Sequence, residues 1–179
     1  MYTIAETTIK DCLIIQPTIL DDNRGSFIKL YHEESFKRLG LNANYEEEYC
    51  SKSVQGVLRG MHFQTPPYAH IKLVTCISGA ILDVVVDLRK NSKTYKQAFG
   101  IELTGESGKM LYVPEGLAHG FYVISKEAIF LSLNSKKYSK EHDSGIHWNS
   151  FGFNWPDSSP NISDKDHQMI YLNEFESPF

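Results

Sequence analysis

Short runs rich in β-branched and aromatic residues recur along most of this 179-residue chain. Glycine, proline, asparagine, aspartate or serine bounds each run, as expected where short strands are joined by turns. The runs occupy residues 12–20, 25–31, 70–88, 98–105, 109–116, 119–125 and 128–134. Closely spaced short strands are typical of antiparallel sandwiches and barrels. We therefore expect a mainly β fold with a few short helices.

Helical signals are weaker and local. In the segment 32–41, HEESFKRLGL, Phe36 and Leu39 are three residues apart and Gly40 can end a helix. The tail from Pro156 onward is expected to be a turn-rich arm with one short helix. The chain has no repeat, low-complexity tract or linker, so we expect a single domain over 1–179 that includes an N-terminal strand arm and a C-terminal arm.

Alternation within residues 80–90, AILDVVVDLRK, gives the expected strand one aliphatic face. Asp83 and Asp87 fall in the other register, so we expect these two acids to point away from that face.

Composition excludes several classes of function. The net charge is −4 and the lysines and arginines are scattered, which does not favour binding to a nucleic-acid backbone. No apolar run approaches the roughly 20 residues of a membrane span, and the opening MYTIAETTIK lacks the pattern of a secretory signal. Cys12, Cys50 and Cys76 are odd in number and widely spaced, which suggests neither a disulfide framework nor a thiolate metal site. We expect a soluble, cytoplasmic protein.

The segment 57–79, VLRGMHFQTPPYAHIKLVTCISG, is unusual because it places titratable groups among residues typical of a buried strand. Arg59, His62, His70 and Lys72 all occur there. A histidine titrates near neutral pH, and a buried ammonium can stabilise a developing anion. The segment is therefore a candidate for acid–base chemistry, although a lone strand histidine is more often structural.

The segment GKMLYVPEGLAH, which ends at His119, resembles the second motif of the cupin superfamily of jelly-roll barrels. Metal-binding cupins supply two histidines and a glutamate from their first motif and another histidine from the second. The corresponding positions here are His62, Gln64, Lys72 and His119. An ammonium beside a divalent ion repels it, so we expect no metal, and a metal-dependent cupin dioxygenase or isomerase is disfavoured.

Six segments together resemble the dTDP-4-dehydrorhamnose 3,5-epimerase family in order and spacing over nearly the whole chain. They are RGSF at 24–27, GVLRGMHFQ at 56–64, KLV at 72–74, VVVDLRKNSKTY at 84–95, VPEGLAHGF at 113–121 and ISDKD at 162–166. The resemblance implies a cupin-type antiparallel jelly-roll barrel. It also implies a cofactor-independent isomerase that epimerises a nucleotide-linked 4-keto-6-deoxyhexose at C3, C5 or both, in deoxysugar and surface-polysaccharide synthesis.

The resemblance also implies roles for individual residues. His62 is expected to be the base, with Asp166 as its carboxylate partner, and Lys72 is expected to stabilise the enolate. Arg24 and Arg59 suit the diphosphate. The other expected substrate-binding positions are Phe27, Lys29, Glu47, Tyr49, Gln64, His119, Tyr138, Asp143 and Lys165. No role follows for His32, His70, His142 or His147.

Family members form homodimers in which an N-terminal strand is exchanged. The segment RGSFIKLY, residues 24–31, matches the part whose residues help to complete the partner's pocket. We therefore expect a homodimer.

The chain departs from the family pattern at its proton-donating tyrosine. That tyrosine stands six residues before the position of Tyr138, where this chain has Ser132. Tyr49 replaces a typical asparagine and is a candidate substitute, the alternative being a packing role. Glu47 replaces a typical glutamine.

A further departure bears on the base of the nucleotide. Lys29 stands where a glutamate near the thymine is usual, and its ammonium would complement cytosine N3. One alternative is therefore a CDP-linked 4-keto-3,6-dideoxyhexose C5-epimerase. Another is a nucleotide-sugar-binding cupin without catalysis.

Overall fold

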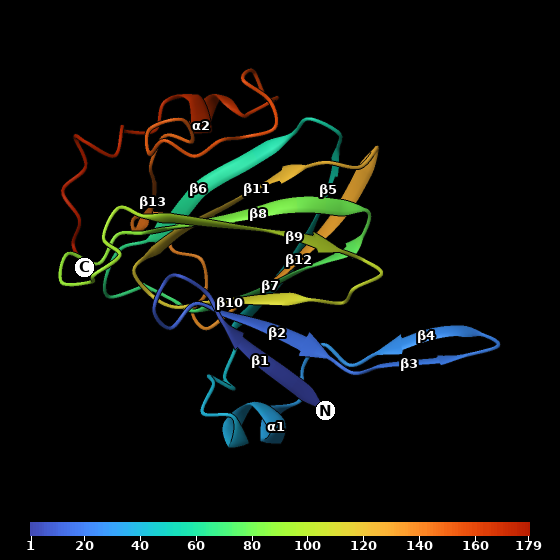
Figure 1. Ribbon diagram of the computed structural model, residues 1–179. Helices are drawn as coiled ribbons and strands as arrows, with labels where there is room; N and C mark the ends of the chain where they lie inside the picture. The colour runs from blue at the N-terminus through green and yellow to red at the C-terminus, as the bar shows by residue number, and fades with distance from the viewer.

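Two antiparallel sheets face each other in the computed structural model, which describes residues 1–179 (Figure 1). The six-stranded sheet has the order β1 (Tyr2–Glu6), β2 (Leu13–Pro17), β10 (Met110–Val113), β7 (Lys72–Ser78), β12 (Glu127–Asn134) and β5 (Glu47–Val54). The five-stranded sheet has the order β13 (Asp143–Gly145), β6 (Leu58–Gln64), β11 (Leu117–Val123), β8 (Ala80–Asp87) and β9 (Ala98–Thr104). This architecture confirms the predicted mainly β, cupin-type barrel.

Apolar side chains from both sheets fill the space between them. Val74 and Phe130 belong to the six-stranded sheet, and Val85 and Phe121 to the five-stranded sheet. The rings of Phe121 and Phe130 stack with centroids 4.4 Å apart, which joins the sheets directly. Burying a side chain of this kind contributes about 1.5–3 kcal/mol. The sheets are therefore held as two fixed walls around one end of the barrel.

Glycines allow backbones to meet at two places that shape the barrel. The predicted run 70–88 is two strands, because Gly79 turns the chain with φ of 81°. Between β6 and β11, a Cβ built on Gly60 would lie 2.6 Å from the Cα of Gly120. This close approach brings β6 against β11, where His62 pairs directly with His119.

Strands β3 (Ile19–Asp22) and β4 (Gly25–Ile28) form a separate hairpin that projects from the barrel (Figure 1). Asp22 pairs with Gly25 across a two-residue loop, and Asp22 Oδ1 accepts the Arg24 N–H at 2.8 Å. Leu20 and Phe27 are 60% and 61% exposed. The hairpin therefore presents apolar side chains to its surroundings.

Both predicted helices are present. Helix α1 (Glu33–Arg38) buries Phe36 and ends before Gly40, whose φ is 71°. Helix α2 (Asp164–His167) lies in the C-terminal tail and begins after Ser163, whose Oγ accepts the Asp166 N–H at 3.2 Å. Neither helix is long and apolar enough to cross a membrane.

The acids of β8 lie in the register opposite that of Leu82, Val84 and Val86, as predicted, but the face they occupy is also buried. Asp83 and Asp87 are both 0% exposed, because this central strand is buried on each of its faces. Each acid has its own cation or imidazole partner: Asp87 binds Arg89, and Asp83 binds His119.

Candidate active site

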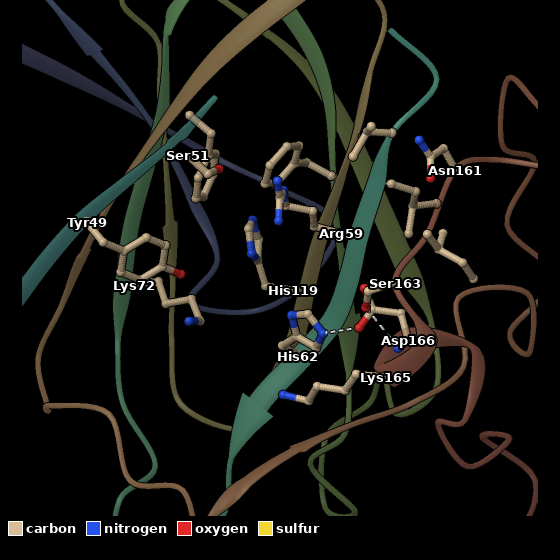
Figure 2. Close-up of a pocket in the computed structure, with 15 residues that line it drawn as sticks. Tyr49, Ser51, Arg59, His62, Lys72, His119, Asn161, Ser163, Lys165 and Asp166 are labelled. Atoms are coloured by element: carbon tan, nitrogen blue, oxygen red, sulfur yellow. Dashed lines mark hydrogen bonds and ion pairs between the residues drawn. The ribbon is translucent and has the colours of Figure 1, made fainter. Parts of the chain in front are cut away.

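A cavity of about 600 Å³ opens between the two sheets at the end of the barrel near α2 (Figure 2). A second hollow of about 390 Å³ adjoins it, since Tyr49, His62, Lys72 and Lys165 line both. The titratable residues around the first cavity are Tyr49, Arg59, His62, Lys72, His119, Lys165 and Asp166. Residues from distant parts of the chain thus share one site.

His62 and Asp166 form a tight pair in the cavity wall. His62 Nε2 lies 2.6 Å from Asp166 Oδ1, and the Gly60 N–H donates to Asp166 Oδ2 at 3.4 Å. Burial raises the pKa of Asp166, but the bond to His62 outweighs it, so the pKa is lowered and the carboxylate stays charged. With Nε2–H held by the carboxylate, Nδ1 is the ring nitrogen that is free to accept a proton.

Lys72 lies across the cavity on β7 and is 8% exposed. Burial lowers the pKa of Lys72 to about 8, against the opposing effects of Asp143, Glu47 and Asp83. Its Nζ donates to Asn134 Oδ1 at 3.4 Å. A largely dehydrated ammonium in this position can stabilise an oxyanion on a bound molecule.

Tyr49 stands directly opposite Ser132 where β5 pairs with β12. Ser132 is 0% exposed, does not line the cavity, and donates its hydroxyl to Asn134 Oδ1 at 3.0 Å. Tyr49 does line the cavity, and Figure 2 shows its hydroxyl pointing inward beside Lys72. The phenol at this end of the sheet therefore comes from β5.

His119 and Asp83 form a second, deeper histidine–carboxylate pair. The distance from His119 Nε2 to Asp83 Oδ2 is 2.9 Å, and the two residues are 6% and 0% exposed. Burial raises the pKa of Asp83, and the neighbouring His119 acts in the opposite direction. The ring of His119 also stacks on Phe130 with centroids 5.7 Å apart. These contacts fix the orientation of the imidazole.

Further polar groups line the two hollows. Arg59 Nε–H donates to Ser53 Oγ at 3.0 Å. Asp143 Oδ2 accepts from Lys165 Nζ at 2.5 Å and from the Tyr138 hydroxyl at 3.2 Å. Arg59 is the cation of this set that is suited to an anionic ligand, whereas Lys165 and Tyr138 donate to the Asp143 carboxylate.

Gln64 has a structural role at the base of the second hollow. Its Oε1 accepts the Ser139 N–H at 2.6 Å, while Nε2 donates to the carbonyl oxygens of Tyr68 and Lys137. No group of three or more His, Cys, Asp or Glu side chains in the chain is arranged to hold a metal ion.

The hairpin residues Arg24, Phe27 and Lys29 are exposed and line neither cavity of their own chain. Arg24 forms an ion pair with Asp22 at 2.6 Å on the projecting hairpin. The structure thus brings together all of the predicted site residues except these three.

A family model described as dTDP-4-dehydrorhamnose 3,5-epimerase matches residues 6–174 of the chain. The chain belongs to this family. It is 41% identical over 166 residues to dTDP-4-dehydrorhamnose 3,5-epimerase from Shigella flexneri, covering 91% of this chain and 92% of that protein.

Solved structures of dTDP-4-dehydrorhamnose 3,5-epimerase family members share the fold closely. The Bacillus anthracis enzyme, with TDP and pyrophosphate bound, is 37% identical with a TM-score of 0.93, covering 96% of this chain and 100% of that one. The Legionella pneumophila dTDP-6-deoxy-D-glucose-3,5-epimerase, in complex with dTDP-4-keto-L-rhamnose, is 33% identical with a TM-score of 0.93, covering 98% and 95%.

Sequence reasoning missed several residues of this epimerase-family site. The alternation places Asp83 on the correct face but does not predict its burial or its pairing with His119, and no role follows from the sequence for His70, which lines the second hollow and lies 3.2 Å from Gln64 Nε2. Asn134 was not anticipated either, although it contacts both Lys72 and Ser132. An acid inside an aliphatic strand was the available signal for Asp83, since such a charge needs a buried partner.

Proposed function

We propose that the chain is a cofactor-independent epimerase of a nucleotide-linked 4-keto-6-deoxyhexose, acting next to the ketone at C3, C5 or both. The observation that carries this proposal is the His62–Asp166 pair facing Lys72 across one cavity. The names of the relatives and the sugar nucleotide bound to the Legionella enzyme support the same substrate class.

The reaction begins with removal of a proton from the carbon beside the ketone. His62 accepts this proton at Nδ1, while Asp166 stabilises the imidazolium through Nε2–H. The electrons of the broken C–H bond move to the ketone oxygen and form an enolate. Lys72 stabilises that oxygen, and return of a proton to the opposite face completes the inversion. The ketone is the electron sink throughout.

Binding of the diphosphate is assigned to Arg59 and Lys165, two cations that line the first cavity, with Lys165 also paired to Asp143. Arg24 of a second copy would add another guanidinium if the β3–β4 hairpin crosses to a partner. We propose such a homodimer, since Leu20 and Phe27 are exposed on the hairpin and a two-stranded ribbon is marginally stable alone. Sedimentation analysis at micromolar concentration tests this, and a monomer with full activity would contradict it.

The nucleotide is proposed to be dTDP, as in the names of the relatives. A CDP-linked 3,6-dideoxy substrate is the alternative raised by Lys29. We place the enzyme in the cytoplasm, in a route to deoxysugars for a surface polysaccharide. Its three cysteines are free thiols, which fits a reducing compartment.

The decisive experiment is incubation with dTDP-4-keto-6-deoxyglucose in deuterated buffer. We expect deuterium at C3, at C5 or at both, with inversion at the labelled carbons. A nucleotide-sugar-binding cupin without catalysis would bind the compound and give no exchange. Absence of exchange with both dTDP- and CDP-linked 4-keto sugars would refute the enzymatic proposal.

A further inference from the structure

Epimerisation through an enolate requires a second proton-transferring group on the face opposite the base. The base His62 lies on β6 in the five-stranded sheet, so the acid must come from the other wall of the cavity. This argument rests on the proposed function and asks which residue returns the proton.

Most titratable groups in the cavity are unsuited to that step. His119 lies beside His62 on the same sheet and is bonded to Asp83. Lys165 is on the same side as Asp166, in the short helix α2, and is paired with Asp143. An arginine such as Arg59 keeps its proton at any ordinary pH. Position and pairing therefore exclude His119 and Lys165 as the second acid, and weak acidity excludes Arg59.

The six-stranded sheet presents two rows of residues to the cavity end of the barrel. In the first row, Asn134 pairs with Glu47 on one side and Lys72 on the other. In the next row, two residues along β12, Ser132 pairs with Tyr49 and Val74. Neighbouring rows on one face lie within reach of long side chains.

The Ser132 side chain is small, so β12 itself does not fill the space between Ser132 and the cavity. The Tyr49 ring extends into that space, and its hydroxyl lies beside the Lys72 ammonium and across the cavity from His62 (Figure 2). We infer that Tyr49 is the acid that protonates the enolate carbon on the face opposite His62.

The acidity of this phenol supports the role, although Tyr49 as a whole residue is 43% exposed. Burial raises the pKa of Tyr49, although the Ser132 hydroxyl opposes the shift, so the phenol is protonated at neutral pH and acts as an acid. Its O–H bond breaks as the new C–H bond forms, and the enolate electrons return to the carbon as the ketone is restored. The resulting phenolate is stabilised by Lys72 and regains a proton from water. His62 releases the abstracted proton to water as well.

The test separates proton removal from inversion. With Tyr49→Phe and dTDP-4-keto-6-deoxyglucose in deuterated buffer, we expect exchange catalysed by His62 to stay within about threefold of the wild type. We expect inversion at one or both exchanging carbons to fall by about 100-fold or more. The matched control is Tyr171→Phe, which removes a hydroxyl from a ring stacked on His147 outside the cavity and should change neither rate.

Two results in Tyr49→Phe would overturn the assignment: inversion at the wild-type rate, or loss of exchange and inversion together. The first would show that another group returns the proton, and the second would show that Tyr49 is needed before the return step. Absence of exchange in the wild-type enzyme is a different result, because it refutes the proposed function itself.

Discussion

His62 Nε2 lies 2.6 Å from Asp166 Oδ1, although the two residues are 104 positions apart in the chain. The contact depends on the C-terminal tail, which is held to the barrel by a bridge between Val57 and Asn161. Ser163 then caps the short helix that carries Asp166. The competence of the proposed base therefore depends on how the tail is anchored.

We predict that His62→Ala or Asp166→Ala lowers solvent exchange by about 100-fold or more, since each change removes the base or its charged partner. Because the two residues act as one unit, the double variant should be little worse than either single variant. Deuterium incorporation into the substrate measures both effects. Ser132→Ala is the control and should remain close to the wild type in exchange, and a fully active His62→Ala enzyme would refute the mechanism.

We predict that activity declines at alkaline pH as Lys72 loses its positive charge. Its pKa is lowered to about 8 by burial, with Asp143, Glu47 and Asp83 as the acids that act in the opposite direction. The ammonium is the form that stabilises the enolate, so kcat/KM should fall about tenfold per unit above pH 8. In Lys72→Arg the cation persists, and the decline should move to higher pH even if the rate is lower. An unchanged alkaline limb in that variant would assign the decline to another group.

Tyr49 on β5 and Ser132 on β12 are cross-strand partners. We therefore predict that the phenol can be moved from β5 to β12 by exchanging the two residues. In the double variant Tyr49→Ser, Ser132→Tyr, the ring starts from β12 and reaches the same cavity wall, so inversion should recover at least in part relative to Tyr49→Ser. Product formation from dTDP-4-keto-6-deoxyglucose provides the measurement. A folded double variant that exchanges solvent and inverts no better than Tyr49→Ser would contradict this geometric equivalence.

Much of the fold could be predicted because local signals agree with the final structure. Turn residues bound the short strands, and Gly40 ends α1 where its position suggested. Alternation places the β8 acids correctly opposite the aliphatic register, but it identifies only which side chains share a face. It does not show that the neighbouring sheet and loops bury both faces.

The proposed site was only partly predictable for a related reason. The resemblance to known epimerases indicated His62, Lys72 and Asp166, whose segments can be matched along the chain. Tyr49 and Ser132 are cross-strand partners because of the register between β5 and β12. That register is set by long-range pairing and cannot be read from either segment alone.

Asp87 provides a prediction for stability. Burial raises its pKa, but hydrogen bonds from Arg89, Ser92 and Thr94 outweigh this and lower the pKa to about 2. Because the folded pKa lies below the unfolded value, the contribution is present above about pH 4 and is lost as the pH falls through 2. Asp87→Asn should lower the free energy of unfolding by about 2 kcal/mol at pH 7.

The difference between Asp87→Asn and the wild type should shrink to about half at pH 3, as the wild-type carboxyl loses its advantage. Urea unfolding at the two pH values measures it. Glu106→Gln, a change at an exposed acid without a partner, should have little effect at either pH. A deficit in Asp87→Asn that is the same at pH 3 and pH 7 would show that packing, and not charge, sets its size.

The last prediction concerns the base of the nucleotide. Lys29 is exposed just after β4 and lines neither cavity of its own chain, so contact with a nucleotide would follow from the proposed homodimer, in which the hairpin crosses to a partner. Thymine offers an N3–H donor and cytosine an N3 acceptor, which means that an ammonium at the base favours cytosine and a carboxylate favours thymine. Given the names of the relatives, we expect calorimetric titration to show tighter binding of dTDP than of CDP, with little change of selectivity in Lys29→Glu. Tighter binding of CDP, reversed by Lys29→Glu, would instead establish the cytidine-linked substrate and place Lys29 against the base.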